Sequence, residues 1–277
     1  MKKIIIKSFL SILLVLLVFS CKTMEQLKEQ RRLDLEREKT LKEIEVGQAV
    51  FAKIAGKYGI LKNQEATEYL NKFGKSLAFY TERQDIEYFF AILNTEQINA
   101  YSLPGGYILI SLGALKQVKN PGALAGIIAH ELGHINKKHI LNNVKIEVRY
   151  NFFELLARFL AGPKQIITNL ANQISEKVEE QLFIKGFANT DEFEADLYAI
   201  NLLQALNIGS KNYIDYLKDL QNIGEHKNLE NLDATHPKIE TRVEKLIEKL
   251  DNNINDLKTT QNFINFKKII DETRIEK

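Results

Sequence analysis

Cysteine, internal repeats and an excess of one charge are nearly or wholly missing from the sequence. One cysteine among 277 residues excludes a disulfide framework, a cysteine-based zinc finger and an iron–sulfur cluster. Histidines and carboxylates must therefore hold any transition metal. The missing repeat argues against a helical-repeat domain. With 38 Lys and Arg against 36 Asp and Glu, the net charge of +2 gives no electrostatic basis for a nucleic-acid partner.

The composition that remains is that of a folded globular protein. Apolar residues make up 45% of the chain and charged residues 27%, which excludes disorder as the main state. The length allows one or two domains with a sizeable core.

The first 20 residues have the layout of a secretory signal peptide. Three lysines precede an apolar run over residues 9–19, which is too short to span a membrane. The run ends in Val18-Phe19-Ser20-Cys21, which resembles a bacterial lipoprotein box. We expect cleavage before Cys21 and a lipid on that residue; the alternative is an uncleaved N-terminal anchor with an incidental cysteine.

Cleavage would remove three lysines and no acidic residue. The mature chain would be close to neutral, so its membrane attachment would rest on acyl chains rather than on a basic patch. Lys22 follows the cysteine, where an aspartate often retains lipoproteins in the inner membrane. By resemblance to that sorting rule, we expect the outer membrane, with the protein facing the periplasm.

The rest of the chain divides into three parts. Residues 21–45 carry the lipidated cysteine and a charged segment of good helix formers without a broad apolar stripe, which predicts a solvated helical tether. Residues 46–250 hold the main domain. Residues 251–277 are rich in Asn, Lys and Asp and predict a polar helix or a loose tail.

The sharpest motif is a helix that ends in His130-Glu131-Leu132-Gly133-His134. Asn120 suits an N-cap and Pro121 the first turn, so the helix should begin there. The two histidines are four positions apart, which puts both imidazoles within about 40° of each other on the helix. Glu131 can then reach a metal-held water, as the H-E-x-x-H motif requires. The alternative, two core histidines, would bury polar rings at a cost that a shared metal removes.

A third ligand must come from elsewhere in the chain. His139 lies about half a turn from His130 on the helical wheel, so we expect it to point away from the site. Downstream, Glu192 and Asp196 share one helical face, whereas Glu194 does not. We therefore predict Glu192 as the ligand and Asp196 as the acceptor for the distal nitrogen of a ligand histidine. The alternative is an acidic first turn that favours the helix dipole.

Four segments together resemble one family, in the family's order over residues 46–250. They are Asn99-Ala100-Tyr101-Ser102-Leu103-Pro104-Gly105-Gly106-Tyr107-Ile108 with Gly113, the H-E-x-x-H segment, Glu192-Phe193-Glu194-Ala195-Asp196, and His236-Pro237 with Arg242. They are similar to segments of the HtpX-like zinc metallopeptidases, relatives of the CAAX prenyl protease (metallopeptidase family forty-eight). The multi-span and repeat domains of some relatives are missing, so the chain looks like a small lipoprotein member, and CAAX-type substrates are not expected.

The resemblance implies a role for each matched residue. It makes His130, His134 and Glu192 ligands of one zinc ion per chain, Glu131 the general base and Asp196 the residue that orients a ligand histidine. His236 and Arg242 would assist at the substrate oxyanion. The segment with Asn99, Ala100, Gly105, Gly106 and Tyr107 would bind substrate.

The residues of that segment predict a small sheet. Residues 86–93 and 107–110 are β-prone, and Pro104-Gly105-Gly106 suits an edge or a tight bend. An edge strand beside the zinc helix could pair with an extended peptide, although a core hairpin without a substrate role fits the strand equally well. The fold class predicted is α+β: a mostly helical zincin-type domain with a small antiparallel sheet next to the H-E-x-x-H helix.

The predicted function is that of a zinc metalloendopeptidase. Its expected partners are unfolded or misassembled envelope polypeptides as substrates, and the membrane through the lipid. Two rivals are a non-catalytic, chaperone-like lipoprotein that binds extended peptides, and a lipoprotein whose zinc only stabilises the fold. The apolar segment 151–161 is too short to span a membrane; core packing, a lid and a membrane-facing helix are its three interpretations.

Overall fold

The computed structural model describes residues 2–144, 176–226, 239–249 and 256–275. The chain divides into two compact units, Met1–Lys42 and Glu43–Lys277. Helix α1, Lys2–Tyr58, passes through the boundary between them. The apolar segment 151–161 and the His236-Pro237 pair lie outside the described residues.

The first unit consists of the N-terminal part of α1. Its residues 24–39 are exposed, and neighbouring turns carry ion pairs such as Arg32–Glu29 and Lys39–Glu36. Exposed pairs of this kind add little stability. Within the part of the chain that the structure describes, no helix has both the length and the apolar character needed to cross a membrane.

The second unit is built around a three-stranded sheet in the order β1-β3-β2. The strands are β1 (Phe89–Leu93), β2 (Ala100–Leu103) and β3 (Tyr107–Ser111). Strands β2 and β3 pair antiparallel, but β1 and β3 pair parallel. The sheet is therefore mixed, which corrects the prediction of an antiparallel one. Strand β3 is central: β2 pairs with one side of it through the short turn and runs antiparallel, while β1 pairs with the other side and runs in the same direction as β3.

A tight turn makes the antiparallel pair possible. The 3-10 turn η1 (Pro104–Gly106) joins β2 to β3, and both of its glycines have left-handed backbones, with φ of 74° at Gly105 and 94° at Gly106. Glycine adopts such angles at little steric cost. The chain thus reverses direction between β2 and β3 within the three residues of η1.

Alternate side chains of the sheet face two helical layers. Ile108 and Ile110 pack in the main core with α2 (Gln64–Ala78) and α4 (Pro121–Asn136). Leu109 packs with Val46 and Val50 from residues 43–58 of α1. The H-E-x-x-H helix therefore covers one face of the sheet, next to edge strand β2.

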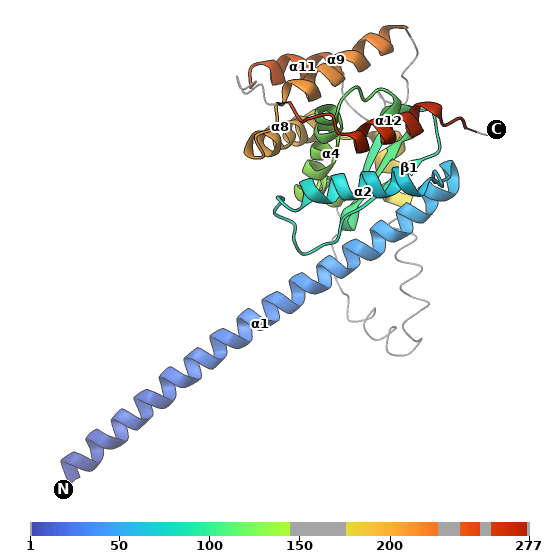
Figure 1. Cartoon of the computed structure of the whole chain (residues 1–277). Helices are drawn as coiled ribbons and strands as arrows, with labels where there is room; N and C mark the ends of the chain where they lie inside the picture. The colour runs from blue at the N-terminus through green and yellow to red at the C-terminus, as the bar shows by residue number, and fades with distance from the viewer. Residues whose placement is uncertain (1, 145–175, 227–238, 250–255, 276–277) are drawn as a thin grey trace, which may run out of the picture. The chain divides into compact units, whose positions relative to one another are not determined.

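Most of the other helices of the second unit pack on α4, on α2 or on one another (Figure 1). The larger ones are α8 (Asn189–Ala205), α9 (Lys211–His226), α11 (Ile239–Ile247) and α12 (Gln261–Glu272); shorter ones are α3 (Leu112–Lys116), α5 (His139–Asn143) and the π-helix η2 (Gln181–Lys185). Phe263, Phe266 and Ile270 of α12 are buried in the main core. The mostly helical α+β class with a small sheet beside the H-E-x-x-H helix is confirmed.

Candidate metal centre

Helix α4 begins as its sequence predicts. The Asn120 side chain accepts a hydrogen bond from the backbone N–H of Ala123 at 2.9 Å, and Pro121 occupies the first turn. Two glycines let the neighbouring helices approach closely. A Cβ at Gly133 would lie 3.1 Å from the Ala195 Cα of α8, and one at Gly126 would lie 2.3 Å from the Tyr213 Cβ of α9.

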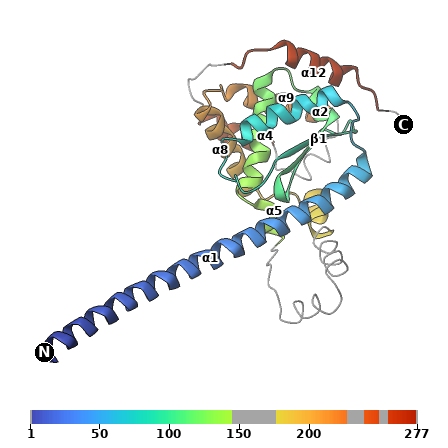
Figure 2. The ribbon, with the colours of Figure 1, turned by 60° about the horizontal axis from the view of Figure 1, so that its bottom comes forward.

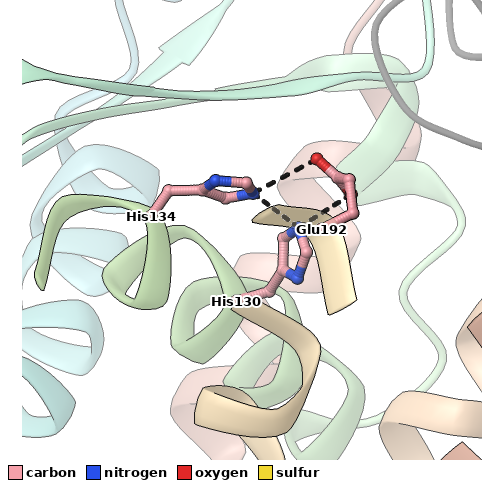
Figure 3. A group of neighbouring side chains, drawn as sticks. All are labelled: His130, His134 and Glu192. Atoms are coloured by element: carbon pink, nitrogen blue, oxygen red, sulfur yellow. Dashed lines mark hydrogen bonds and ion pairs between the residues drawn. The ribbon is translucent and has the colours of Figure 1, made fainter. Parts of the chain in front are cut away.

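This close packing brings three buried side chains to one point (Figure 3). The Nε2 atoms of His130 and His134 lie 3.1 Å apart. Glu192, from α8, places Oε2 3.5 Å from His130 Nε2 and Oε1 3.3 Å from His134 Nε2. One ligand atom from each residue falls within 4.8 Å of the other two.

The donor set fits a zinc ion. Two imidazole nitrogens and a carboxylate are the ligands of catalytic zinc sites, which keep a further position open. Burial acts to lower the pKa of His130, but Asp196 and Glu192 raise it to about 9, whereas burial lowers the pKa of His134 to about 3. A ligand imidazole must be neutral, so zinc binding would release the proton that the neighbouring carboxylates favour on His130.

Asp196 lies on the far side of the His130 ring, one turn after Glu192 on α8. Its Oδ1 is 2.9 Å from His130 Nδ1. Burial raises the pKa of Asp196, but Arg242 and His130 outweigh burial and hold that pKa well below its usual range. The charged carboxylate keeps the proton of His130 on Nδ1 and turns Nε2 toward Glu192.

Arg242 and Tyr213 complete the surroundings of Asp196. Arg242 donates from Nε at 2.8 Å and from Nη2 at 2.7 Å, and the Tyr213 hydroxyl donates at 2.6 Å. The Nη1 of Arg242 also lies 3.1 Å from Glu192 Oε2. One guanidinium thus contacts both the ligand carboxylate and the orienting one. No local sequence motif marks Tyr213, so its place beside Asp196 is visible only in the fold.

His139 corrects a prediction made from the helical wheel. Helix α4 ends at Asn136, Lys138 adopts a left-handed backbone with φ of 56°, and α5 begins at His139. The turn returns His139 to the site, where its Nδ1 lies 2.9 Å from His134 Nδ1. The wheel gave the wrong direction because it assumed an unbroken helix. Figure 2 shows α5 following the end of α4.

A pocket of about 50 Å³ opens beside the cluster. The pocket lies between edge strand β2, α4 and α9, next to Glu131, the base expected from the motif. Its wall includes Asn99, Ala100, His130, Glu131, Tyr216 and Leu217. Arg242 also lines it. Glu131 is buried, as suits a general base that works away from bulk water.

Three of the predicted substrate residues are not brought to this pocket. The N–H of Gly105 donates to Glu43 Oε1 at 3.1 Å, and a Cβ at Gly106 would lie 2.3 Å from the Glu87 oxygen. The Tyr107 ring stacks on Phe89 with centroids 5.3 Å apart. Among the five predicted substrate residues, only Asn99 and Ala100 line the pocket with Glu131.

Paired histidines on a buried H-E-x-x-H helix, with a carboxylate ligand from a neighbouring helix, define a zinc metallopeptidase. The chain belongs to peptidase family M48, whose family model matches residues 64–250.

Three relatives illustrate its position in the family. The chain is 21% identical over 208 residues to the beta-barrel assembly-enhancing protease of Escherichia coli (strain K12), an alignment that covers 73% of this chain and 42% of that protein. It is 22% identical over 175 residues to the metalloprotease LoiP of the same organism, covering 63% and 67%. It is 24% identical over 170 residues to the mitochondrial metalloendopeptidase OMA1 of Bos taurus, covering 58% and 32%. The chain thus spans about two fifths of the length of the first relative.

Proposed function

We propose that this zinc metallopeptidase is a lipid-anchored endopeptidase of the bacterial envelope that hydrolyses misfolded or misassembled envelope polypeptides. The observation that carries the proposal is the shared pocket, in which Glu131 and His130 face edge strand β2. An extended peptide paired with an edge strand is held mainly by backbone hydrogen bonds. Such binding suits unfolded chains of many sequences.

In the proposed catalytic step, His130, His134 and Glu192 would hold the zinc ion. When bound, zinc would supply Lewis-acid chemistry, polarising the substrate carbonyl and making water a stronger nucleophile near neutral pH. Glu131 accepts the proton of the attacking water and passes it to the leaving amine. Asn99 and Ala100 align the substrate backbone at β2, while Gly105, Gly106 and Tyr107 hold the end of that strand in place.

Two further residues are proposed to act on the developing oxyanion. His236 would donate a hydrogen bond, and Arg242 would add positive charge. Arg242 lines the pocket, so its charge would act on a substrate there while its guanidinium keeps Asp196 and Glu192 in place. Asp196 would keep His130 oriented throughout the cycle.

The envelope location rests on the chain's own N-terminus and on its relatives. The signal layout that ends in Cys21 supports a small lipoprotein member of the family, attached to the outer membrane on its periplasmic side. One relative is a beta-barrel assembly-enhancing protease, which supports a role in envelope quality control. In the proposed organisation, residues 1–20 are the signal peptide, 21–45 the lipidated tether, 46–250 the peptidase domain and 251–277 a polar C-terminal segment.

The Glu131→Gln variant of the full chain tests the assignment. General-base catalysis is worth about 10²–10⁴ in rate, so cleavage of an unfolded protein such as casein should fall by that factor while zinc content stays unchanged. Glu65→Gln, at an exposed glutamate of α2, is the matched control. Full activity of Glu131→Gln would refute the role of the base. A wild-type protein that binds zinc and casein without cleaving would favour the chaperone-like lipoprotein.

A further inference from the structure

The second ligand histidine, His134, begins a series of side-chain contacts that leads away from the metal centre. His134 Nδ1 lies 2.9 Å from His139 Nδ1, and His139 Nε2 lies 3.3 Å from Glu194 Oε2. The other oxygen of Glu194 is 3.1 Å from Lys137 Nζ. His139 is buried, with 3% of its surface exposed. The roles given above to the H-E-x-x-H motif, Glu192 and Asp196 do not account for this series of contacts.

The direction of the hydrogen bonds follows from the orientation of the first ring. His134 Nε2 faces Glu192 and His130. A ligand His134 therefore carries its proton on Nδ1, and this N–H donates a hydrogen bond to His139 Nδ1. His139 then carries its own proton on Nε2, which faces Glu194. Each neutral ring thus has one defined tautomer.

Stacking fixes the plane of the His134 ring but not which of its two flips is present, and the hydrogen bond to His139 selects between the flips. Phe187 stacks on the His134 ring, with centroids 4.0 Å apart and planes 26° apart, and so restricts the plane of the ring. The side-chain torsion of histidine is roughly two-fold, and a 180° flip keeps that plane. The flipped ring, however, turns a carbon toward Glu192 where Nε2 should be. Only the orientation with Nδ1 toward His139 keeps a nitrogen at the metal centre.

We propose that His139 is a positioning residue of the zinc site, which selects the metal-binding flip of His134 and is itself oriented by Glu194. The inference rests on the zinc site of the proposed function. His139 does for His134 what Asp196 does for His130, and it reaches the site only because the left-handed Lys138 breaks the helix after Asn136.

Zinc affinity of the full-length protein, measured by chelator competition, tests the proposal directly. Loss of an outer-shell partner weakens metal binding by about 10–100-fold, and we expect that loss in His139→Ala. His139→Asn should recover most of the affinity, because its Oδ1 occupies the place of Nδ1 and accepts the same hydrogen bond. Glu194→Ala should fall between wild type and His139→Ala, since it removes only the outer contact.

Asn71→Ala is the matched control for the loss of a hydrogen-bonding side chain. Asn71 bonds the N–H and C=O of Phe90 in β1, away from the metal, so its removal should leave zinc affinity unchanged. Urea unfolding of the metal-free proteins shows whether each variant is folded, and an unfolded His139→Ala leaves His139→Asn and Glu194→Ala to decide. Wild-type affinity in folded His139→Ala, or no recovery in folded His139→Asn, would overturn the proposal. A wild-type chain that binds no zinc would instead refute the metal centre itself.

Discussion

The Glu43→Ala substitution should destabilise the second unit strongly, although it lies outside the metal centre. Glu43 accepts hydrogen bonds from Arg83 Nη1 at 3.1 Å, from Arg83 Nη2 at 3.0 Å and from the N–H of Gly105 at 3.1 Å. Its side chain is 5% exposed and that of Arg83 9%. One buried carboxylate of α1 thus joins the loop before β1 to the turn after β2.

The magnitude follows from what the substitution leaves behind. Removing one partner of a buried ion pair costs about 3–5 kcal/mol, because the other charge stays buried. Asp85 reduces this cost, since it keeps two contacts with Arg83 at 2.7 and 3.0 Å. The N–H of Gly105 loses its acceptor in the variant, which adds about 1–3 kcal/mol to the loss of stability. The two effects offset each other in part, and we expect a loss of about 3–5 kcal/mol in the free energy of unfolding.

Urea unfolding followed by circular dichroism measures this loss. With a slope of about 2–3 kcal/mol per molar urea, the midpoint should fall by roughly 1–2.5 M. Glu45→Ala is the control, because Glu45 is an exposed carboxylate on the same helix and its loss should cost less than about 0.5 kcal/mol. Equal midpoints for the two variants would show that the buried network does not stabilise this unit.

Two further predictions concern the N-terminus and the aromatic core. Cys21→Ser should abolish incorporation of radiolabelled palmitate while Glu131→Gln keeps it, and a labelled serine variant would refute lipidation at Cys21. Burial raises the pKa of Tyr69 from 10.0 to about 12; its contribution to stability is therefore complete below pH 10 and is lost as the pH rises toward about 12. Urea midpoints across this range should fall less steeply in Tyr69→Phe, which retains the stacking on Phe266, and identical pH profiles would contradict this origin.

The sequence predicts the two histidine ligands because their geometry is local. The spacing of His130 and His134 on one helix fixes their shared face, and Asn120 with Pro121 fixes where that helix begins. The pairing side of β1 is a different matter, because β1 and β3 are separated in sequence by β2 and no local pattern shows which edge of β3 it takes. His139 fails for a local reason, since a single left-handed residue changes the direction of everything after it.

The residues around the ligands depend on tertiary packing and could be found only from the fold. Tyr213 reaches Asp196 because Gly126 lets α9 approach α4, and a Cβ at position 126 would fall 2.3 Å from the Tyr213 Cβ. Asp196 in turn orients His130, so a missing side chain on α4 determines how a ligand on the same helix is held. Gly126 and Gly133, which face α9 and α8, therefore help to position the side chains of the metal centre. A methyl group at Gly126 would disturb the orientation of His130 without touching any ligand.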